Sequence, residues 1–300
     1  MEGILIIDKP TEWTSHDVVG KLRRLLKTKR IGHTGTLDPF ATGVLVMLVG
    51  QATRLAQFLD KDTKEYEATI QFGFETETGD LTGGMRDEGG GMNDEEVAEI
   101  LNKTNWDELL TSFRGELEQV PPMYSAKKVE GKKLYELARK GVEIERKPVS
   151  ITIYHLELLD EIPNPKSQIQ IRVACSAGTY IRTLAEDIGR KIGVPCHLSA
   201  LRRTKAGKFD LAKAVTIQEL EEIIEAEKLG DYLVSMNEAV SHLTEVKLSA
   251  EEVKKTQNGL KVNRHLETEV VRLVDESENL IAIGFYNSEQ KSIQPKVVFV

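Results

Sequence analysis

A glycine-rich polar segment near the start of the chain reads Ile31-Gly-His-Thr-Gly-Thr-Leu-Asp-Pro-Phe-Ala-Thr-Gly43. It runs directly into Val44-Leu-Val-Met-Leu-Val49, an apolar run that predicts a buried strand. Earlier in the chain, Gly3-Ile-Leu-Ile-Ile7 predicts another short buried strand. A polar loop that core strands deliver in this way is a favourable place for functional side chains.

Asp38 is the strongest catalytic candidate in this segment. Its carboxylate stands between glycines and directly before Pro39, which favours an extended backbone at the preceding residue. Asp-Pro is also a routine turn pair, so the pair alone indicates no more than a turn.

Helix and strand signals alternate along the chain. Ser15 is expected to cap an amphipathic helix, and Tyr66–Phe72 alternates in polarity as a half-buried strand does. The acidic, glycine-rich segment Asp80–Asn93 is expected to be a mobile surface loop. Further helices are expected from Asn93, from Thr104, over Lys132–Gly141, from Thr179 to about Ile192, and from Thr216 through Glu227, the last being the final helix of the larger domain. Further strands are expected over Val149–Leu159, Gln168–Cys175, Glu245–Leu248, Glu269–Val274 and Pro295–Val300.

Composition excludes several protein classes. The 300 residues are 40% hydrophobic and 29% charged, and no apolar run approaches the ~20 residues that span a bilayer. Two cysteines are too few for a disulfide framework, and no histidine or cysteine spacing matches a metal site. The first residues lack the features of a secretion signal. We expect a metal-free cytoplasmic protein.

Basic residues gather in two runs although the net charge is −8. Lys21–Arg30 contains six basic residues and no acid, and the second run is Arg202, Arg203, Lys205 and Lys208. Each run alone is most simply a solvated face. Runs that converge in space would instead form a patch that binds phosphates.

The segment Gly32–Leu45 closely resembles the catalytic motif of the bacterial tRNA pseudouridine synthase B family. Further blocks match the family in the same order, over roughly Gly3 to Phe209. These blocks are Asp8-Lys-Pro10 with Thr14-Ser15, Lys64-Glu-Tyr66, Pro121-Pro-Met-Tyr-Ser-Ala-Lys127 with Tyr135 and Ala138-Arg139, Gly178-Thr-Tyr-Ile-Arg-Thr-Leu184, and His197-Leu-Ser-Ala-Leu-Arg-Arg-Thr204.

The resemblance implies three catalytic residues. Asp38 would be the catalytic aspartate, Tyr66 would stack on the displaced uracil within reach for proton transfer, and Arg182 would pair with Asp38. Arg182 falls in the first turn of its expected helix, where the helix dipole disfavours a cation, and such violations tend to mark functional sites. Uridine isomerisation involves no net oxidation and no external group, so no cofactor is required.

The resemblance also implies residues that contact RNA or shape the pocket. Leu201 would be its apolar wall, His33 would pack against the rearranged RNA loop, and Lys9 and Pro10 would brace the catalytic loop. The remaining candidates for RNA binding are Tyr180, Arg202, Arg203, Lys21 and Arg24.

The fold that these observations predict is α+β, with a mixed, largely antiparallel central sheet and flanking helices. Residues 1–240 would form the catalytic domain and residues 241–300 a small β-rich, PUA-like domain. The implied reaction is isomerisation of the uridine at position 55, in the T loop of tRNA, by a monomer without an obligatory protein partner. Two alternatives stay open: a guide-RNA-dependent pseudouridine synthase, and an RNA-binding folding aid whose main role is not catalytic.

Overall fold

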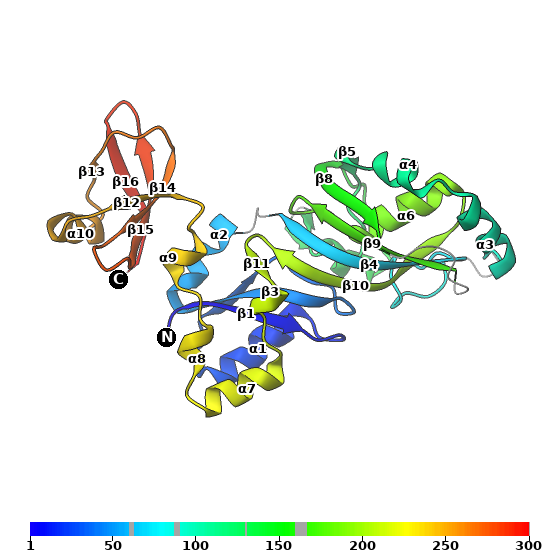
Figure 1. Ribbon diagram of the computed structural model, residues 1–300, viewed down its shortest axis with the longest axis horizontal. Coiled ribbons are helices and arrows are strands. Elements are labelled where there is room, and N and C mark those ends of the chain that lie inside the picture. The colour runs from blue at the N-terminus through cyan, green and yellow to red at the C-terminus, as the bar shows by residue number, and fades with distance from the viewer. Residues whose placement is uncertain (60–62, 87–90, 130, 160–166, 300) are drawn as a thin grey trace.

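The computed structural model describes residues 1–59, 63–86, 91–129, 131–159 and 167–299 (Figure 1). Its larger sheet consists of β1 Gly3–Lys9, β2 Ile31–Thr34, β3 Thr42–Val49, β4 Lys64–Phe72, β5 Gly115–Gln119, β8 Val149–Leu158, β9 Gln168–Cys175, β10 Cys196–Ala206 and β11 Phe209–Asp210. The helices are α1 Ser15–Leu25, α2 Ala56–Leu59, α3 Asp94–Lys103, α4 Trp106–Thr111, α5 Leu134–Ala138, α6 Ile181–Ile192, α7 Ile217–Glu225, α8 Leu229–Tyr232, α9 Met236–Ala239 and α10 Ala250–Gln257.

The larger sheet follows the order β1-β3-β10-β4-β9-β8-β5, with β2 also on β3 and β11 on β10. Its pairs are antiparallel except β3 with β10, which pair in parallel through Thr42 with Arg202 and Gly43 with Arg203. This two-residue pairing, which we call the seam, joins the half built by β1, β2 and β3 to the half built by the other strands. The predicted α+β class with a largely antiparallel sheet is confirmed.

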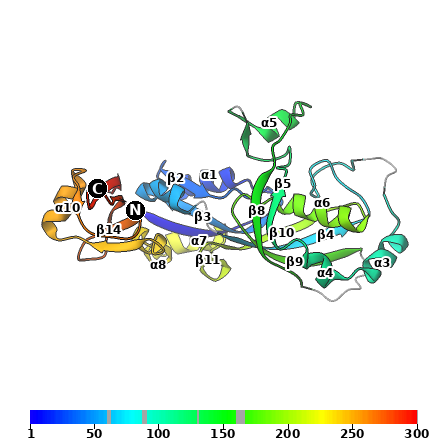
Figure 2. The ribbon, with the colours of Figure 1, turned by 90° about the horizontal axis from the view of Figure 1, so that it is seen from above.

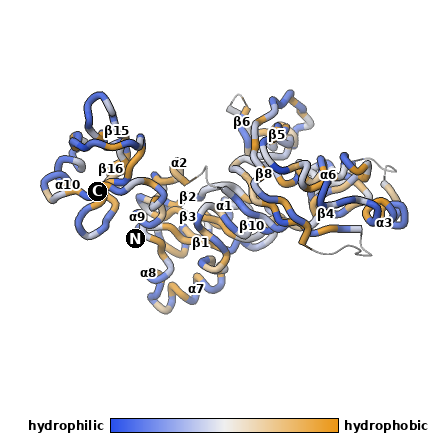
Figure 3. The backbone as a smooth tube through the Cα atoms, turned by 45° about the horizontal axis from the view of Figure 1, so that its top comes forward, coloured by the Kyte–Doolittle hydropathy of each residue, from blue (hydrophilic) through white to orange (hydrophobic). Residues whose placement is uncertain are grey.

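Strands β1 and β3 are buried on both faces, as their continuous apolar runs predict. Leu5 and Ile7 face a core shared with α1 and α6, whereas Ile4 and Ile6 face a second core that includes Ile283 of the C-terminal sheet. Figure 3 shows hydrophobic residues concentrated along these central strands and a mostly hydrophilic α10. The Asp38 loop therefore begins at β2 and ends at β3, a strand that is buried on both faces.

A second, five-stranded sheet contains only strands from the end of the chain (Figure 1). It has the order β12-β14-β15-β16-β13, formed by Thr244–Lys247, Val270–Val274, Leu280–Asn287, Ser292–Val298 and Val262–Asn263 respectively. Its side chains Val274, Ile283 and Phe299 share a core with β1 and β3. The guanidinium of Arg54 adds a polar tie, since it donates to the carbonyl of Val298.

The segment around α5 stands away from the larger sheet (Figure 2). It also holds the two-stranded ribbon of β6 Lys128–Val129 and β7 Lys132–Lys133. The predicted helix over Lys132–Gly141 is therefore shorter than expected, because its first two residues belong to the ribbon.

Several expected boundaries were wrong. Thr14, not Ser15, caps α1, and it forms a capping box with Asp17. Asn105, not Thr104, caps α4. The helix from Thr216 ends at Glu225, and α8 and α9 follow it, so it is not the last helix before the C-terminal sheet. Asp80 was expected in a mobile loop but is 3% exposed. The glycine-rich residues 87–90 and the final residue, Val300, lie outside the described residues.

Candidate active site

The loop that carries Asp38 connects β2 to β3. Residues of β1 and α1 form hydrogen bonds with it. The Ser15 hydroxyl accepts a hydrogen bond from the backbone of Leu37 at 3.0 Å. The ammonium of Lys9, fully buried at the end of β1, donates to the carbonyls of Pro39 at 3.1 Å, Trp13 at 2.6 Å and Pro10 at 2.8 Å. Burial lowers the Lys9 pKa to about 8. The Lys9 ammonium thus links the Pro10 carbonyl to the loop that carries Asp38.

Arg182, the second residue of α6, pairs with Asp38 through two guanidinium nitrogens. Nε lies 3.1 Å from Asp38 Oδ2, and Nη2 lies 3.4 Å from Oδ1. Two backbone carbonyls hold the same guanidinium, that of Thr78 at 2.8 Å from Nη1 and that of Tyr124 at 2.6 Å from Nη2. Such a planar fork fixes the orientation of a carboxylate as well as its charge. The predicted pairing of Arg182 with Asp38 is present.

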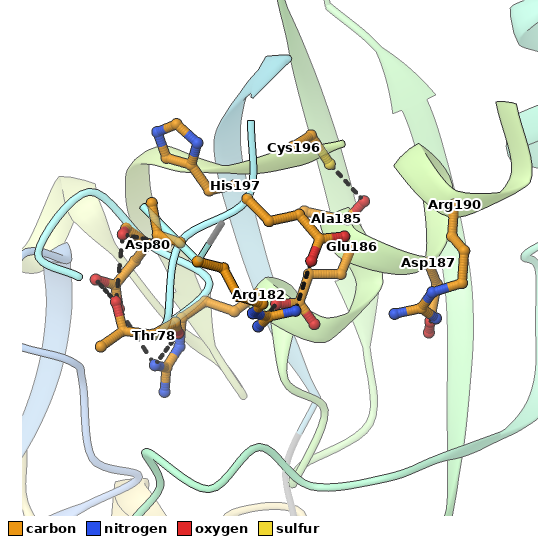
Figure 4. A network of polar contacts seen from close by, with 12 residues as sticks. Thr78, Asp80, Arg182, Ala185, Glu186, Asp187, Arg190, Cys196 and His197 are labelled. Atoms are coloured by element: carbon orange, nitrogen blue, oxygen red, sulfur yellow. Dashed lines mark hydrogen bonds and ion pairs between the residues drawn. The ribbon is translucent and has the colours of Figure 1, made fainter. Parts of the chain in front are cut away.

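Asp80 is a second carboxylate on Arg182, and it is not among the residues that the sequence predicts for the site. Its Oδ2 lies 3.2 Å from Arg182 Nη1, and both side chains are 5% exposed (Figure 4). The other oxygen, Oδ1, accepts from the hydroxyls of Thr78 and Thr82. Glycines and acids around Asp80 indicate a surface loop, so only the local Thr-x-Asp-x-Thr spacing hinted at an ordered turn.

Burial raises the pKa of the Asp38 carboxyl above its usual range, and the nearby Asp80 carboxylate adds to this. The Arg182 guanidinium opposes both effects without reversing them. The side chain is still 34% exposed. Asp38 is therefore a carboxylate of increased basicity that faces solvent on one side, which suits attack on a substrate carbon.

A pocket of about 240 Å³ opens in front of Asp38 and Arg182. Tyr66 from β4 and Leu201 from β10 line it, both less than a tenth exposed, and Tyr180 lines it as well. Burial raises the pKa of Tyr66, so its phenol is neutral in the free protein. The volume lies below the ~300–1,000 Å³ of sites for larger ligands and suits a single flat ring with part of a sugar.

Arg203 differs from its expected place in an exposed basic run. It is 1% exposed, and its guanidinium donates to the carbonyls of Val44 at 2.7 Å and Gly35 at 3.0 Å. It also hydrogen-bonds the Tyr66 hydroxyl and lines the pocket. The expectation that Arg203 lies on a solvated basic face is wrong, because backbone carbonyls bind its buried guanidinium at the wall of the pocket.

The other expected RNA-binding cations have mixed surroundings. Arg202 forms a two-nitrogen pair with Asp8, with a shortest distance of 2.7 Å, and remains 39% exposed. Lys21 pairs with Glu221 of α7, so an acidic helix neutralises part of the first basic run. Arg24 is exposed on α1.

His33 lies beside the loop, next to His16. Their rings meet edge to face with centroids 5.8 Å apart. Burial lowers the His33 pKa to about 4, so this imidazole is neutral at physiological pH. A neutral, half-buried ring beside the pocket is suited to packing against a base.

The described residues contain no group of three histidine, cysteine or acidic side chains that could hold a metal ion. Cys175 and Cys196 are free thiols, both buried as expected. No helix in the described part of the chain has the length and apolarity to span a bilayer.

Comparison with known proteins gives the arrangement a family. Residues 23–181 match the TruB family pseudouridylate synthase N-terminal domain, and residues 182–241 match the tRNA pseudouridylate synthase B C-terminal domain. The boundary between these two matches falls in the first turn of α6. Strands of the larger sheet lie on both sides of this boundary, so both matches contribute to that sheet.

Full-length relatives agree. A protein of Bacillus cytotoxicus named tRNA pseudouridine synthase B is 41% identical, over 100% of this chain and 98% of its own. One of the same name from Bacillus licheniformis is 44% identical over 86% of this chain and 82% of its own.

Solved structures share the fold. A crystal structure of a Cbf5-Nop10-Gar1 complex matches with a TM-score of 0.72 and 25% identity, over 99% of this chain and 85% of that one. A crystal structure of the archaeal box H/ACA sRNP Nop10-Cbf5 complex matches with a TM-score of 0.68 and 24% identity, over 99% and 86% of the two chains. With both halves of the family pattern matched, and with relatives above 40% identity along the chain, this protein belongs to the TruB family of pseudouridylate synthases.

Proposed function

We propose that the protein converts a uridine in the T loop of tRNA to pseudouridine, with Asp38 as the attacking carboxylate on a flipped-out base. The observation that carries this proposal is the Asp38–Arg182 pair at the mouth of a pocket walled by Tyr66 and Leu201. The names of the full-length relatives support tRNA as the substrate.

The proposed reaction rearranges one nucleotide without gain or loss of atoms. The bond from ribose C1′ to uracil N1 breaks, and a bond from C1′ to C5 forms after the ring turns. The proton on C5 leaves to solvent or to a base, and N1 gains a proton. The Asp38 carboxylate, held in line by the fork of Arg182, forms a transient bond to the nucleotide and is released unchanged once the C1′–C5 bond has formed.

The other residues of the pocket would accommodate the flipped-out base. Extrusion of a base costs a few kcal/mol, and stacking on an aromatic side chain offsets ~1–3 kcal/mol of this. Tyr66 provides the aromatic surface, while Leu201 excludes water. His33 packs on the RNA loop outside the pocket, and Arg202, Arg24 and Tyr180 contact the phosphate backbone or neighbouring nucleotides.

Release of tritium from C5-labelled uridine in an unmodified tRNA transcript tests the proposal, without guide RNA, metal or cofactor. We expect release by the wild type and none by Asp38→Asn, with tRNA binding retained. The matched control is Asp231→Asn, the same change at an exposed carboxylate on α8, which should release tritium at the wild-type rate.

The other outcomes separate the alternatives. Tight binding without release by the wild type would favour the guide-RNA-dependent reaction or the folding aid, and refolding of tRNA by Asp38→Asn would support the latter as an additional activity. We also infer a cytoplasmic monomer without an obligatory partner, which the two free thiols support. Co-purification of a stoichiometric protein partner that activity requires would contradict this.

A further inference from the structure

Two of the groups that hold Arg182 come from one tight turn, residues 75–86. Thr78 contributes its carbonyl and Asp80 its carboxylate, at 2.8 and 3.2 Å from Arg182 Nη1. The position of the guanidinium, and therefore of the Asp38 carboxylate, depends on where this turn lies. What fixes the turn against α6 thus bears on the proposed reaction.

The inner side of the turn is fixed by backbone hydrogen bonds to β10. Leu81 donates to the carbonyl of Leu198 at 2.9 Å, and Leu198 donates to that of Gly79 at 3.0 Å. Within the turn, the Thr76 hydroxyl donates to the carbonyl of Asp80 at 2.7 Å. These bonds hold one edge of the turn but do not tie it to the helix that carries Arg182.

The outer side is tied to α6 by an ion pair. Arg86 closes the turn onto Glu75, with its Nη1 2.5 Å from Oε2, and its Nη2 lies 3.1 Å from Oε1 of Glu186. Glu186 follows Arg182 by four residues, so the two side chains share one face of α6 (Figure 4). One helix face therefore grips the turn at two successive points.

The contact between the turn and this face is close. A Cβ on Gly79 would lie 2.9 Å from Glu186 Oε1 and 3.5 Å from Arg182 Cβ, and its φ is +71°. Only glycine lets the turn lie flat between the two side chains. The Glu186 side chain is 16% exposed, and Arg86 offsets part of the effect of burial on the Glu186 pKa.

We propose that Glu186 and Arg86 form a latch that holds the 75–86 turn on α6 and so positions Arg182 for Asp38. Glu186 is a positioning residue: it touches neither Asp38 nor the pocket. This inference rests on the proposed function. Without the latch, the turn keeps its bonds to β10 and its contacts with Arg182 through Thr78 and Asp80, but it loses its second attachment to α6, and the Arg182 fork is held less firmly.

The test uses the full chain and single-turnover tritium release at saturating enzyme, so that product release does not hide the chemical step. Glu186→Gln, Arg86→Gln and the double variant are compared with Asp187→Asn. Asp187 is a neighbour on the same helix, and its ion pair within the described part of the chain is the local one with Arg190 at 2.5 Å, which makes it the matched control.

We expect each single latch variant to lower the rate constant about tenfold, since small misplacements of catalytic groups cost up to ~100-fold. The double variant should be no slower than either single one, because both break the same contact. tRNA binding should stay within about twofold and the acidic limb of the pH–rate profile should move to higher pH, since a looser Arg182 opposes the raised Asp38 pKa less.

A purely structural role would instead lower thermal stability and leave the pH limb unchanged. Rates equal to those of Asp187→Asn, or additive losses in the double variant, would overturn the latch. Absence of release by the wild type would instead count against the proposed function, so the two failures are distinguishable.

Discussion

Asp38 and Arg182 form an ion pair in which the arginine is buried, the carboxylate is partly exposed, and the pKa of the carboxyl is still raised. A carboxyl paired with an arginine commonly has a lowered pKa, and here desolvation and the second carboxylate, Asp80, outweigh the pairing. The fold therefore disfavours the ionised form of Asp38, which is the form that the proposed attack needs. Active sites often retain such local costs because the function needs them.

Asp38→Asn should for this reason be more stable than the wild type at pH 7. Because the folded-state pKa of Asp38 lies above its unfolded value, the folded state binds more protons between the two values, and stability falls as pH rises through that window. The expected gain is on the order of 1 kcal/mol at most, since a third of the side chain is solvated. Denaturant midpoints at pH 4 and pH 7 measure it.

The difference in stability between Asp38→Asn and the wild type should narrow toward pH 4. Arg182 keeps its contacts with Asp80 and with the carbonyls of Thr78 and Tyr124 in the variant, so no buried charge is left alone. A variant less stable than the wild type at pH 7 would show that Arg182 outweighs desolvation.

Residue identities predicted part of the site. The loop glycines and Pro39 marked Asp38 only weakly, and an arginine in a helix's first turn hinted at Arg182. The resemblance to the pseudouridine synthase family assigned their roles. The role of Asp80 and the burial of Arg203 could not be found in this way, because both depend on long-range packing: Arg203 is separated by 168 residues from Gly35, whose carbonyl it binds. Charge runs predict solvent exposure, and burial of one member is a tertiary effect.

At the scale of elements, close approach of β3 to β10 depends on one glycine. A Cβ on Gly43 would lie 2.2 Å from the carbonyl oxygen of Arg203, and its φ is +99°. Gly43→Ala should therefore disrupt the seam and abolish both activity and stable folding, a loss of more than ~3 kcal/mol. Chemical denaturation and tritium release measure the two effects.

Gly20 in α1 is the matched control for this substitution. A Cβ there meets nothing within 4 Å, and alanine is the better helix former by ~0.5–1 kcal/mol. Gly20→Ala should thus raise the free energy of unfolding slightly. Equal behaviour of the two variants would show that the seam tolerates a side chain.

Hydrophobic patterning predicted several strands that carry a strong apolar signal and missed strands that lack one. β4 and β9 were predicted because apolar residues alternate in them. β5 was missed because its sequence, Gly115-Glu-Leu-Glu-Gln119, is mostly polar and exposed, and only pairing with β8 makes it a strand. The sequence likewise predicts a loop where β2 lies, because its glycine and histidine give no apolar alternation. Pairing with β3 is what makes this segment a strand.

At the scale of the whole molecule, the two sheets share one of the hydrophobic clusters. Ile4 and Val46 of the larger sheet lie in the same cluster as Ile283 and Phe299. In this cluster, each sheet covers apolar side chains of the other. We therefore expect a single cooperative unfolding transition for the chain, measured by calorimetry and by tryptophan fluorescence. Two well-separated transitions would show that residues 241–300 unfold on their own, as an independent domain would.

The seam between β3 and β10 also governs when the protein can become active. Its partners Thr42 and Arg202 lie 160 residues apart, so their pairing is among the contacts with the largest loop-closure cost. Asp38 is synthesised early, but Leu201 and the seam's second strand emerge much later in translation. The pocket therefore assembles only once most of the chain has been made, and a partly synthesised or partly folded chain carries the nucleophile without a site in which to use it.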